Sequence, residues 1–439
     1  MLGQPRLFGS ELRRLRIAAG LSLNGMAALV HYSKGQLSKV ETGHKRPSPE
    51  LARLCDTALE AGGTLAALVR DRPRHTATPS TAPRTVSTTL FPPPTQGEVW
   101  PMSEDATDPG EDVAPGRRRV MAAGAASLLS LGCAAPSAAD PVGPPLIDAA
   151  RSLFDHFRTL GQTAGPQIVL PALTAQTRSL CDLAADAGLR ARPGLLTISS
   201  RYAEFAGWMS QEAGDDGAAL RWTERAVALA AAGGDRHLAT YALVRRALIS
   251  FYAEDAAETI ALARRAQEAA APPRIAGLAA QQEAQGHALA GDRTACLHAL
   301  DRARDLLARP DDDPASPVIG SSFLSDPVSM ITGWCRYDLG QPRQAAAALD
   351  REVAKLPAHS LRNRARYGVR RALAHAAAGE IEHACSLTRE LLGAVTLLNS
   401  ATITTDLRRL ARTLTRYGTH HAVRELSPDL TLALHAGSR

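Results

Sequence analysis

A proline-rich stretch between residues 73 and 116 divides the chain into parts that must fold separately. Nine prolines occur there among Ser, Thr and acidic residues. Because proline lacks a backbone donor and such a mixture buries little apolar surface, we expect a disordered linker. A second proline-rich break extends it to residue 145. The sequence thus predicts three parts: residues 1–72, the linker 73–145 and residues 146–439.

The two outer parts are expected to be helical. Hydrophobic residues make up 45% of the 439-residue chain, but aromatic residues only 4%. A core of this composition consists mainly of Ala, Leu and Val, which suits closely packed helices. No long run of alternating β-branched residues is present. The sequence therefore predicts an all-α protein with at least two domains.

The N-terminal part carries most of the excess positive charge. Residues 1–72 hold 11 Lys and Arg against 6 Asp and Glu, a balance of +5, whereas the whole chain has +6. The linker segment 73–116 has a balance of −4. A small basic part of this kind is what a DNA-binding domain requires.

Start and stop signals predict four short helices within residues 10–59. Ser and Gly residues at the expected caps bound the first three helices, and a proline begins the fourth. In the third helix, Leu37 and Val40 are spaced to face the core. The expected ranges are Ser10–Ala19, a helix following Ser22, Lys34–Thr42 after a turn at His31 and Tyr32, and Pro49–Leu59.

The order Leu21-Ser22, Met26-Ala27, Ser33 to Glu41, Gly43 and Pro47-Ser48 resembles the Xre (phage-repressor) helix-turn-helix family over about 60 residues. The resemblance implies a domain of five-helix type whose third helix enters the major groove of double-stranded DNA. The chain departs from the family pattern at Leu23, where a Gln often contacts phosphate, and at His31, where a turn Gly is common. These departures put one backbone contact and the ideal turn in doubt.

The resemblance implies DNA contacts along and just beyond the third helix. Lys34 and Lys39 would donate to guanine, and Gly35 would allow close approach of the backbone. The remaining residues suit phosphate or groove-edge contacts. The alternative for the two lysines is a merely solvated helix face. The full set is Ser33, Lys34, Gly35, Gln36, Ser38, Lys39, His44, Lys45 and Arg46.

Helix-pair signals recur in the C-terminal part. Turn residues at 214, 254, 291, 340 and 379 are followed five positions later by a small residue, which lets two helices approach closely. The series resembles the tetratricopeptide repeat, although the spacings of 37–49 residues exceed its usual period. Together with the N-terminal part, the chain resembles actinobacterial Xre regulators with a C-terminal tetratricopeptide-like α-solenoid.

In such a solenoid, the first helix of each pair lines a concave face. Aromatic, amide and arginine side chains are expected there, which suits an extended peptide or protein segment. The alternative is that Trp208, Trp334 and Tyr337 only pack within their helices. The predicted groove residues are Arg201, Glu204, Trp208, Tyr241, Phe251, Gln281, Gln285, Trp334, Tyr337 and Arg366.

No motif for a cofactor, a metal or catalysis stands out, so we expect no enzyme. His375 and His383 have no carboxylate or Cys at ligand spacing in the sequence. Scattered cysteines and an N-terminus without an apolar signal core favour the cytoplasm. The stretch Arg117–Arg119 with Val120–Ala135 resembles an export signal superficially, but it is short and lies within the chain.

The sequence thus favours a sequence-specific DNA-binding transcriptional regulator, expected to be a homodimer, whose repeats dimerise or sense a ligand. One alternative is a helical-repeat scaffold with only nonspecific DNA tethering. Another is a membrane-attached or secreted repeat protein that starts at an internal Met.

Overall fold

The computed structural model describes residues 4–70, 144–269, 271–309, 319–320, 324 and 326–436. These residues form nineteen α-helices and one short 3-10 helix, and the described ranges contain no strand. The expected all-α fold is confirmed. The predicted linker and the segment Val120–Ala135 lie outside the described residues, apart from the linker's last two positions, which begin a helix.

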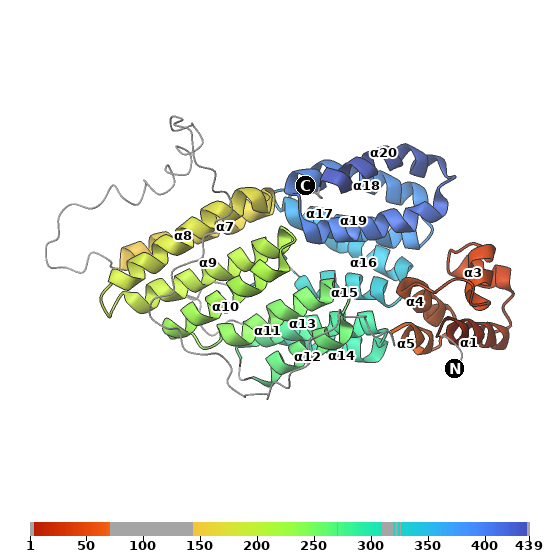
Figure 1. The fold of residues 1–439 in the computed structure, drawn as a ribbon, viewed down its shortest axis with the longest axis horizontal. Coiled ribbons are helices and arrows are strands. Elements are labelled where there is room, and N and C mark those ends of the chain that lie inside the picture. Colours follow the sequence, from red (N-terminus) through yellow and green to blue (C-terminus); the bar gives the residue numbers. More distant parts are fainter. Residues whose placement is uncertain are drawn as a thin grey trace, which may run out of the picture. The chain divides into compact units, whose positions relative to one another are not determined.

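The N-terminal part, which we call the head, has five helices (Figure 1). Sequence signals predicted four of them within one or two residues at most ends, but α1 begins earlier and brings Phe8 into the core, where it is fully buried. The helices are α1 (Gln4–Ala18), α2 (Leu23–Leu29), α3 (Lys34–Glu41), α4 (Pro49–Ala58) and α5 (Thr64–Arg70).

The fifth helix was not located from the helix signals, and a buried carboxylate explains its start. Asp56 of α4 accepts hydrogen bonds from the backbone N–H groups of Leu65 and Ala66, at 2.9 and 2.7 Å. These groups lie in the first turn of α5, where no intrahelical partner exists. The cap thus comes from another helix.

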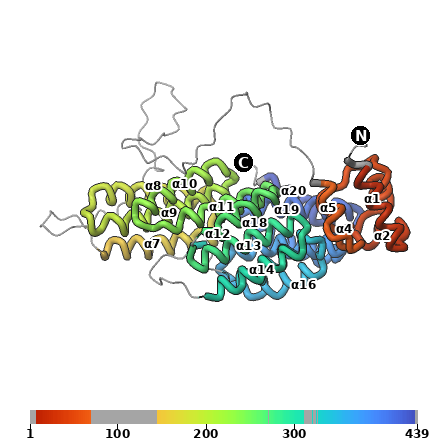
Figure 2. Tube along the Cα trace, turned by 90° about the horizontal axis from the view of Figure 1, so that it is seen from below, coloured from red at the N-terminus to blue at the C-terminus, as the bar shows by residue number. Residues whose placement is uncertain are grey.

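The C-terminal part is a series of antiparallel helix pairs, and successive pairs lie side by side (Figure 2). The first three pairs are formed by α7 (Pro144–Thr163), α8 (Pro166–Asp186), α9 (Arg192–Glu212), α10 (Asp216–Ala232), α11 (Leu238–Tyr252) and α12 (Ala256–Glu268). They are followed by α13 (Pro273–Ala290), α14 (Arg293–Leu307), α15 (Pro327–Asp338), α16 (Pro342–Ala354), α17 (Leu361–Ala377), α18 (Ile381–Leu398), α19 (Ala401–Leu414), η1 (Thr415–Tyr417) and α20 (His421–Ala436).

The five predicted turns share one backbone conformation. Gly214, Glu254, Gly291, Gly340 and Gly379 have φ between 60° and 88°, the left-handed region that favours glycine. After three of these turns, an aspartate side chain caps the next helix by accepting a backbone N–H. These caps are Asp215, Asp255 and Asp292. The turn and cap together explain the recurring Gly-Asp signal.

The small residues predicted between paired helices are buried. Ala219, Thr259, Cys296, Ala345 and Ala384, each five positions after a turn residue, are fully inaccessible. Their size allows the close helix approach on which the repeat depends.

A buried charge network joins helices that are far apart in sequence. Glu212 at the end of α9 is fully buried and binds Arg362 at 2.6 Å, and it also pairs with Arg366. Ser400 and Thr402 donate to the same carboxylate at 2.6 and 2.9 Å. Burial acts to raise the pKa of Glu212, but the two arginines outweigh it and lower the pKa to about 2.

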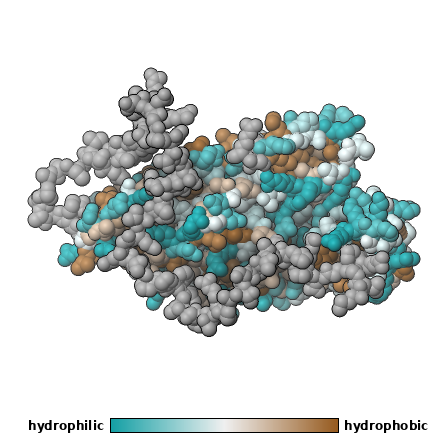
Figure 3. Space-filling view, in the orientation of Figure 1, coloured by the Kyte–Doolittle hydropathy of each residue, from teal (hydrophilic) through white to brown (hydrophobic). Residues whose placement is uncertain are grey.

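In the described ranges, no helix combines the length and apolar character needed to cross a membrane. On the face drawn in Figure 3, hydrophilic residues are spread widely over the repeats and the head, with hydrophobic residues scattered among them.

Candidate nucleic-acid interface and repeat-domain cavity

The helix pair α2–α3 is bounded by serine caps. Ser22 accepts a hydrogen bond from the N–H of Gly25, and Ser33 accepts one from that of Gln36. Between the helices, His31 has φ 53°. The position at which the chain departs from the expected turn Gly therefore adopts the conformation that glycine favours.

The inner and outer faces of α3 differ as predicted from residue spacing. Leu37 and Val40 are buried against the other head helices. Lys34, Gly35 and Lys39 are exposed on the other side. A Cβ built on Gly35 meets no atom within 4 Å, so the protein itself does not require glycine there.

The other predicted DNA contacts lie around this helix. Ser33 is exposed and caps α3, while Gln36 and Ser38 are half-buried. The exposed basic segment beyond α3 is tied back to the helix by Lys45, whose backbone N–H donates to the carbonyl of Lys39 at 2.9 Å. That segment consists of His44, Lys45 and Arg46.

An ion pair that was not predicted from the sequence fixes α3 against α1. Arg16 binds both carboxylate oxygens of Glu41, at 2.7 and 2.9 Å, and donates to the carbonyl of Leu21 at 2.8 Å. The Glu41 hydrogen bond raises the pKa of Arg16. Because Glu41 lies at the end of α3, the pair sets the orientation of the whole helix.

A family model described as a helix-turn-helix domain matches residues 7–69. Residues 7–69 are a helix-turn-helix domain. The exposed face of α3 therefore belongs to the second helix of the motif, which in such domains enters the major groove.

Two further comparisons concern the whole chain. A crystal structure of a Rap protein complexed with competence and sporulation factor is similar at 10% identity and a TM-score of 0.39, covering 66% of this chain and 99% of the Rap chain. No curated protein matches the chain.

The repeat domain contains a cavity of about 190 Å³, lined mainly by the first helix of each helix pair. Eight of the ten predicted groove residues line it: Arg201, Glu204, Trp208, Tyr241, Gln281, Gln285, Trp334 and Arg366. Phe251 and Tyr337 do not. Phe251 is fully buried and packs against Trp334 with ring centroids 5.3 Å apart.

Several polar atoms around the cavity are buried without a hydrogen-bond partner. They include Nε and Nη1 of Arg201, both amide atoms of Gln285, Nε1 of Trp334 and Nδ2 of Asn363. Each of these four residues is at most 8% exposed. Unpaired buried polar groups cost free energy, so their concentration around a cavity indicates a place for a polar ligand or ordered water.

Arginines are concentrated around the cavity. Its lining contains five arginines and one carboxylate, that of Glu204, which pairs with Arg245. Arg201 and Arg366 pair with Asp235 and Glu212, which are not part of the lining. Arg158 and Arg274 donate to the backbone carbonyls of Gly320 and Ile319 at 2.8 Å. Burial lowers the pKa of Arg158, which shows that its charge is held in a poorly solvated position.

Sequence reasoning missed several lining residues. Arg158 and Gln162 come from α7, which precedes the first repeat signal. Arg245 lies four positions, about one helical turn, beyond the predicted groove residue Tyr241, and its Nη2 donates to Gln211 at 3.1 Å. Adding the residues one turn away from the predicted set would have found Arg245, but no repeat signal pointed to α7.

Proposed function

We propose that this protein is a sequence-specific DNA-binding transcriptional regulator, with α3 in the major groove of operator DNA. The observation that carries the proposal is the exposed polar face of α3 within a helix-turn-helix domain that belongs to a basic part of the chain, residues 1–72 with a net charge of +5. Lys34 and Lys39 contact base edges, while His44, Lys45 and Arg46 neutralise phosphates. The protein acts in the cytoplasm.

The decisive experiment compares two double variants in a gel-shift titration on an operator selected from random duplexes. Lys34→Ala with Lys39→Ala removes two charges from α3, whereas Arg13→Ala with Arg14→Ala removes two exposed charges from α1. We expect at least a hundredfold loss for the first and a much smaller loss for the second, because base contacts contribute about 1–3 kcal/mol each.

Equal losses in the two variants would contradict base reading. Together with strong salt dependence and no preferred sequence, they would favour the alternative of a repeat scaffold that tethers to DNA nonspecifically. Circular dichroism on both variants verifies that helical content is unchanged.

We further propose that the protein binds DNA as a homodimer. One small domain offers limited contact area, and two half-sites about one helical turn apart supply the missing affinity. Multi-angle light scattering on the protein alone and on its operator complex tests this; a complex with a single chain per operator would contradict it.

The cavity of the repeat domain supports a second role, the binding of a peptide signal. Unpaired atoms of Gln285 and Asn363 suit a peptide backbone, which offers both donors and acceptors. The excess of arginine favours a peptide with a carboxylate-bearing residue or end, since Arg pairs well with carboxylates.

Two of the chain's four tryptophans line the cavity, so intrinsic fluorescence reports its occupancy. We expect pools of acidic peptides to change the emission of the protein, and pools of basic peptides not to. Arg201→Gln should weaken the acidic response at least tenfold. An equal response to both pools, or an unaffected Arg201→Gln variant, would contradict the peptide proposal.

A further inference from the structure

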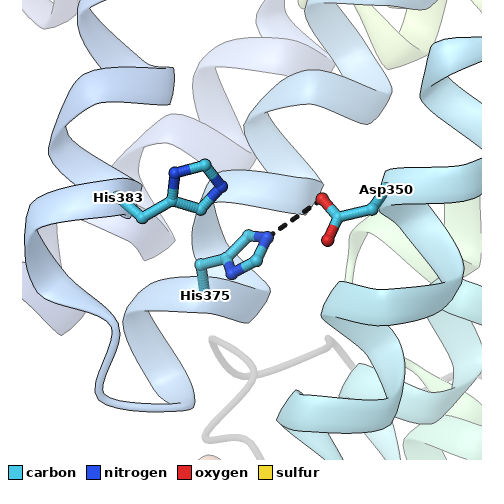
Figure 4. A group of neighbouring side chains, drawn as sticks. All are labelled: Asp350, His375 and His383. Carbon is cyan, nitrogen blue, oxygen red and sulfur yellow. Dashed lines mark hydrogen bonds and ion pairs between the residues drawn. The ribbon is translucent and has the colours of Figure 1, made fainter.

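Three side chains from three successive helices meet where the helix pair α15–α16 packs against the pair α17–α18. Asp350 lies on α16, His375 on α17 and His383 near the start of α18 (Figure 4). Their potential ligand atoms all lie within 4.8 Å of one another. Glu380 and Glu382 lie close to the two histidines in the sequence, but the carboxylate of this cluster comes from the preceding helix pair.

The hydrogen bonds of His375 leave a place for a cation. Its Nδ1 lies 2.6 Å from Glu380 and its Nε2 lies 3.0 Å from Asp350. A neutral imidazole carries one proton and can donate only once. If Nδ1 donates to Glu380, the Nε2 lone pair faces Oδ1 of Asp350, which also accepts a hydrogen bond from Arg371, and a cation bound between Nε2 and the carboxylate would satisfy both.

His383 brings a second imidazole to the same place. Its ring stands perpendicular to that of His375 with centroids 4.5 Å apart, and its ligand atom lies within 4.8 Å of those of His375 and Asp350. Arg371 donates to Asp350 at 2.5 Å and holds the carboxylate in place. Carboxylates that orient a histidine through its other nitrogen, as Glu380 does here, are typical partners of metal sites.

We propose that Asp350, His375 and His383 bind a divalent first-row metal ion, Zn²⁺ above all. Two imidazoles and one carboxylate form a ligand set that Zn²⁺ accepts, with water completing a tetrahedral site. The ion joins α16 of one helix pair to α17 and α18 of the next. It thereby stiffens the stack of repeats, and none of its three ligands lines the cavity.

Full-length protein stripped with a chelator and titrated with ZnCl₂ in a calorimeter tests the proposal. We expect one saturable site per chain and a higher melting temperature with Zn²⁺ than with the chelator. Co²⁺ in place of Zn²⁺ should give the visible absorption of a four-coordinate site.

Two exposed histidines provide a matched pair of variants. His383→Ala should weaken Zn²⁺ at least tenfold and abolish the rise in melting temperature, whereas His298→Ala on α14 should change neither. Asp350→Asn should resemble His383→Ala. If Asp350→Asn fails to fold, the exposed His383 still decides the question. Absence of a saturable site in the wild type, or identical titrations of the two histidine variants, would overturn the proposal.

Discussion

The single residue Glu212 joins distant helices of the repeat domain. Its carboxylate takes hydrogen bonds or ion pairs from α17 and from the start of α19, and Arg362 carries the network on to the carbonyls of Gly161 and Ala164 at 2.6 and 2.7 Å. No local pattern marks this glutamate in the sequence. Its partners are 150 or more positions away, so only the packed structure identifies them.

Replacement of Glu212 by Gln should lower the free energy of unfolding by about 3–5 kcal/mol. The substitution keeps the shape of the side chain but strands two buried arginines without a counter-charge. Urea denaturation followed by circular dichroism measures the change. The exposed Glu258→Gln on α12 is the control and should stay near the wild type; equal behaviour of the two variants would contradict the role of the network.

Stability should also fall in acid because of the same residue. The pKa of Glu212 in the folded protein, about 2, lies below the unfolded value of about 4.3. Its contribution is therefore complete above about pH 4.3 and is lost as the pH falls toward 2. Denaturation series at pH 6, 4 and 3 should show a smaller decrease for Glu212→Gln than for the wild type.

At the scale of elements, short-range signals were sufficient for the five repeat turns. These turn residues were placed correctly because a left-handed residue, followed in three cases by a capping aspartate, is encoded within two positions. The pair α7–α8 escaped prediction because Gly165 between these helices has φ −73°, an ordinary value that leaves no glycine-specific signal. The Arg16–Glu41 pair joins residues 25 apart and was likewise not predictable from spacing.

Two glycine substitutions should have opposite effects. Gly214→Ala places a Cβ on a turn residue with φ 88° and should lower the free energy of unfolding by about 1–2 kcal/mol. Gly393→Ala, in the exposed part of α18 with no atom within 4 Å of the new Cβ, should raise it by about 0.5–1 kcal/mol. Chemical denaturation under one set of conditions compares them, and a stabilising Gly214→Ala would contradict the turn conformation.

Loss of the Arg16–Glu41 ion pair between α1 and α3 should increase local opening of α3 without unfolding the domain. We expect Arg16→Ala to accelerate amide hydrogen exchange in α3 and to weaken operator binding about tenfold, since Glu41 loses both of its charged hydrogen bonds. Exchange followed by mass spectrometry locates the effect. Unchanged protection of residues 34–41 would show that other contacts position the helix.

For the whole molecule, the sequence predicted two helical parts and most of the residues that line the cavity from the repeats, but not how side chains from separate helices converge. The groove positions came from one repeat register, which placed eight side chains at the cavity and misplaced Phe251 and Tyr337 into packed positions. The cavity also depends on α7 and on residues 319–320, which follow no repeat rule. The cluster around His375 required three helices to be placed before its carboxylate could be found.

Gly35 has a consequence for how the target of this protein can change. Gly35 lies on the exposed face of α3, with open space where a side chain would begin. Residues other than proline would favour the helix more than glycine does and would project outward rather than into the core, which in the proposed DNA complex is toward the bases. Under the proposed function, a single codon change at this position can therefore alter the operator while leaving the fold of the domain intact.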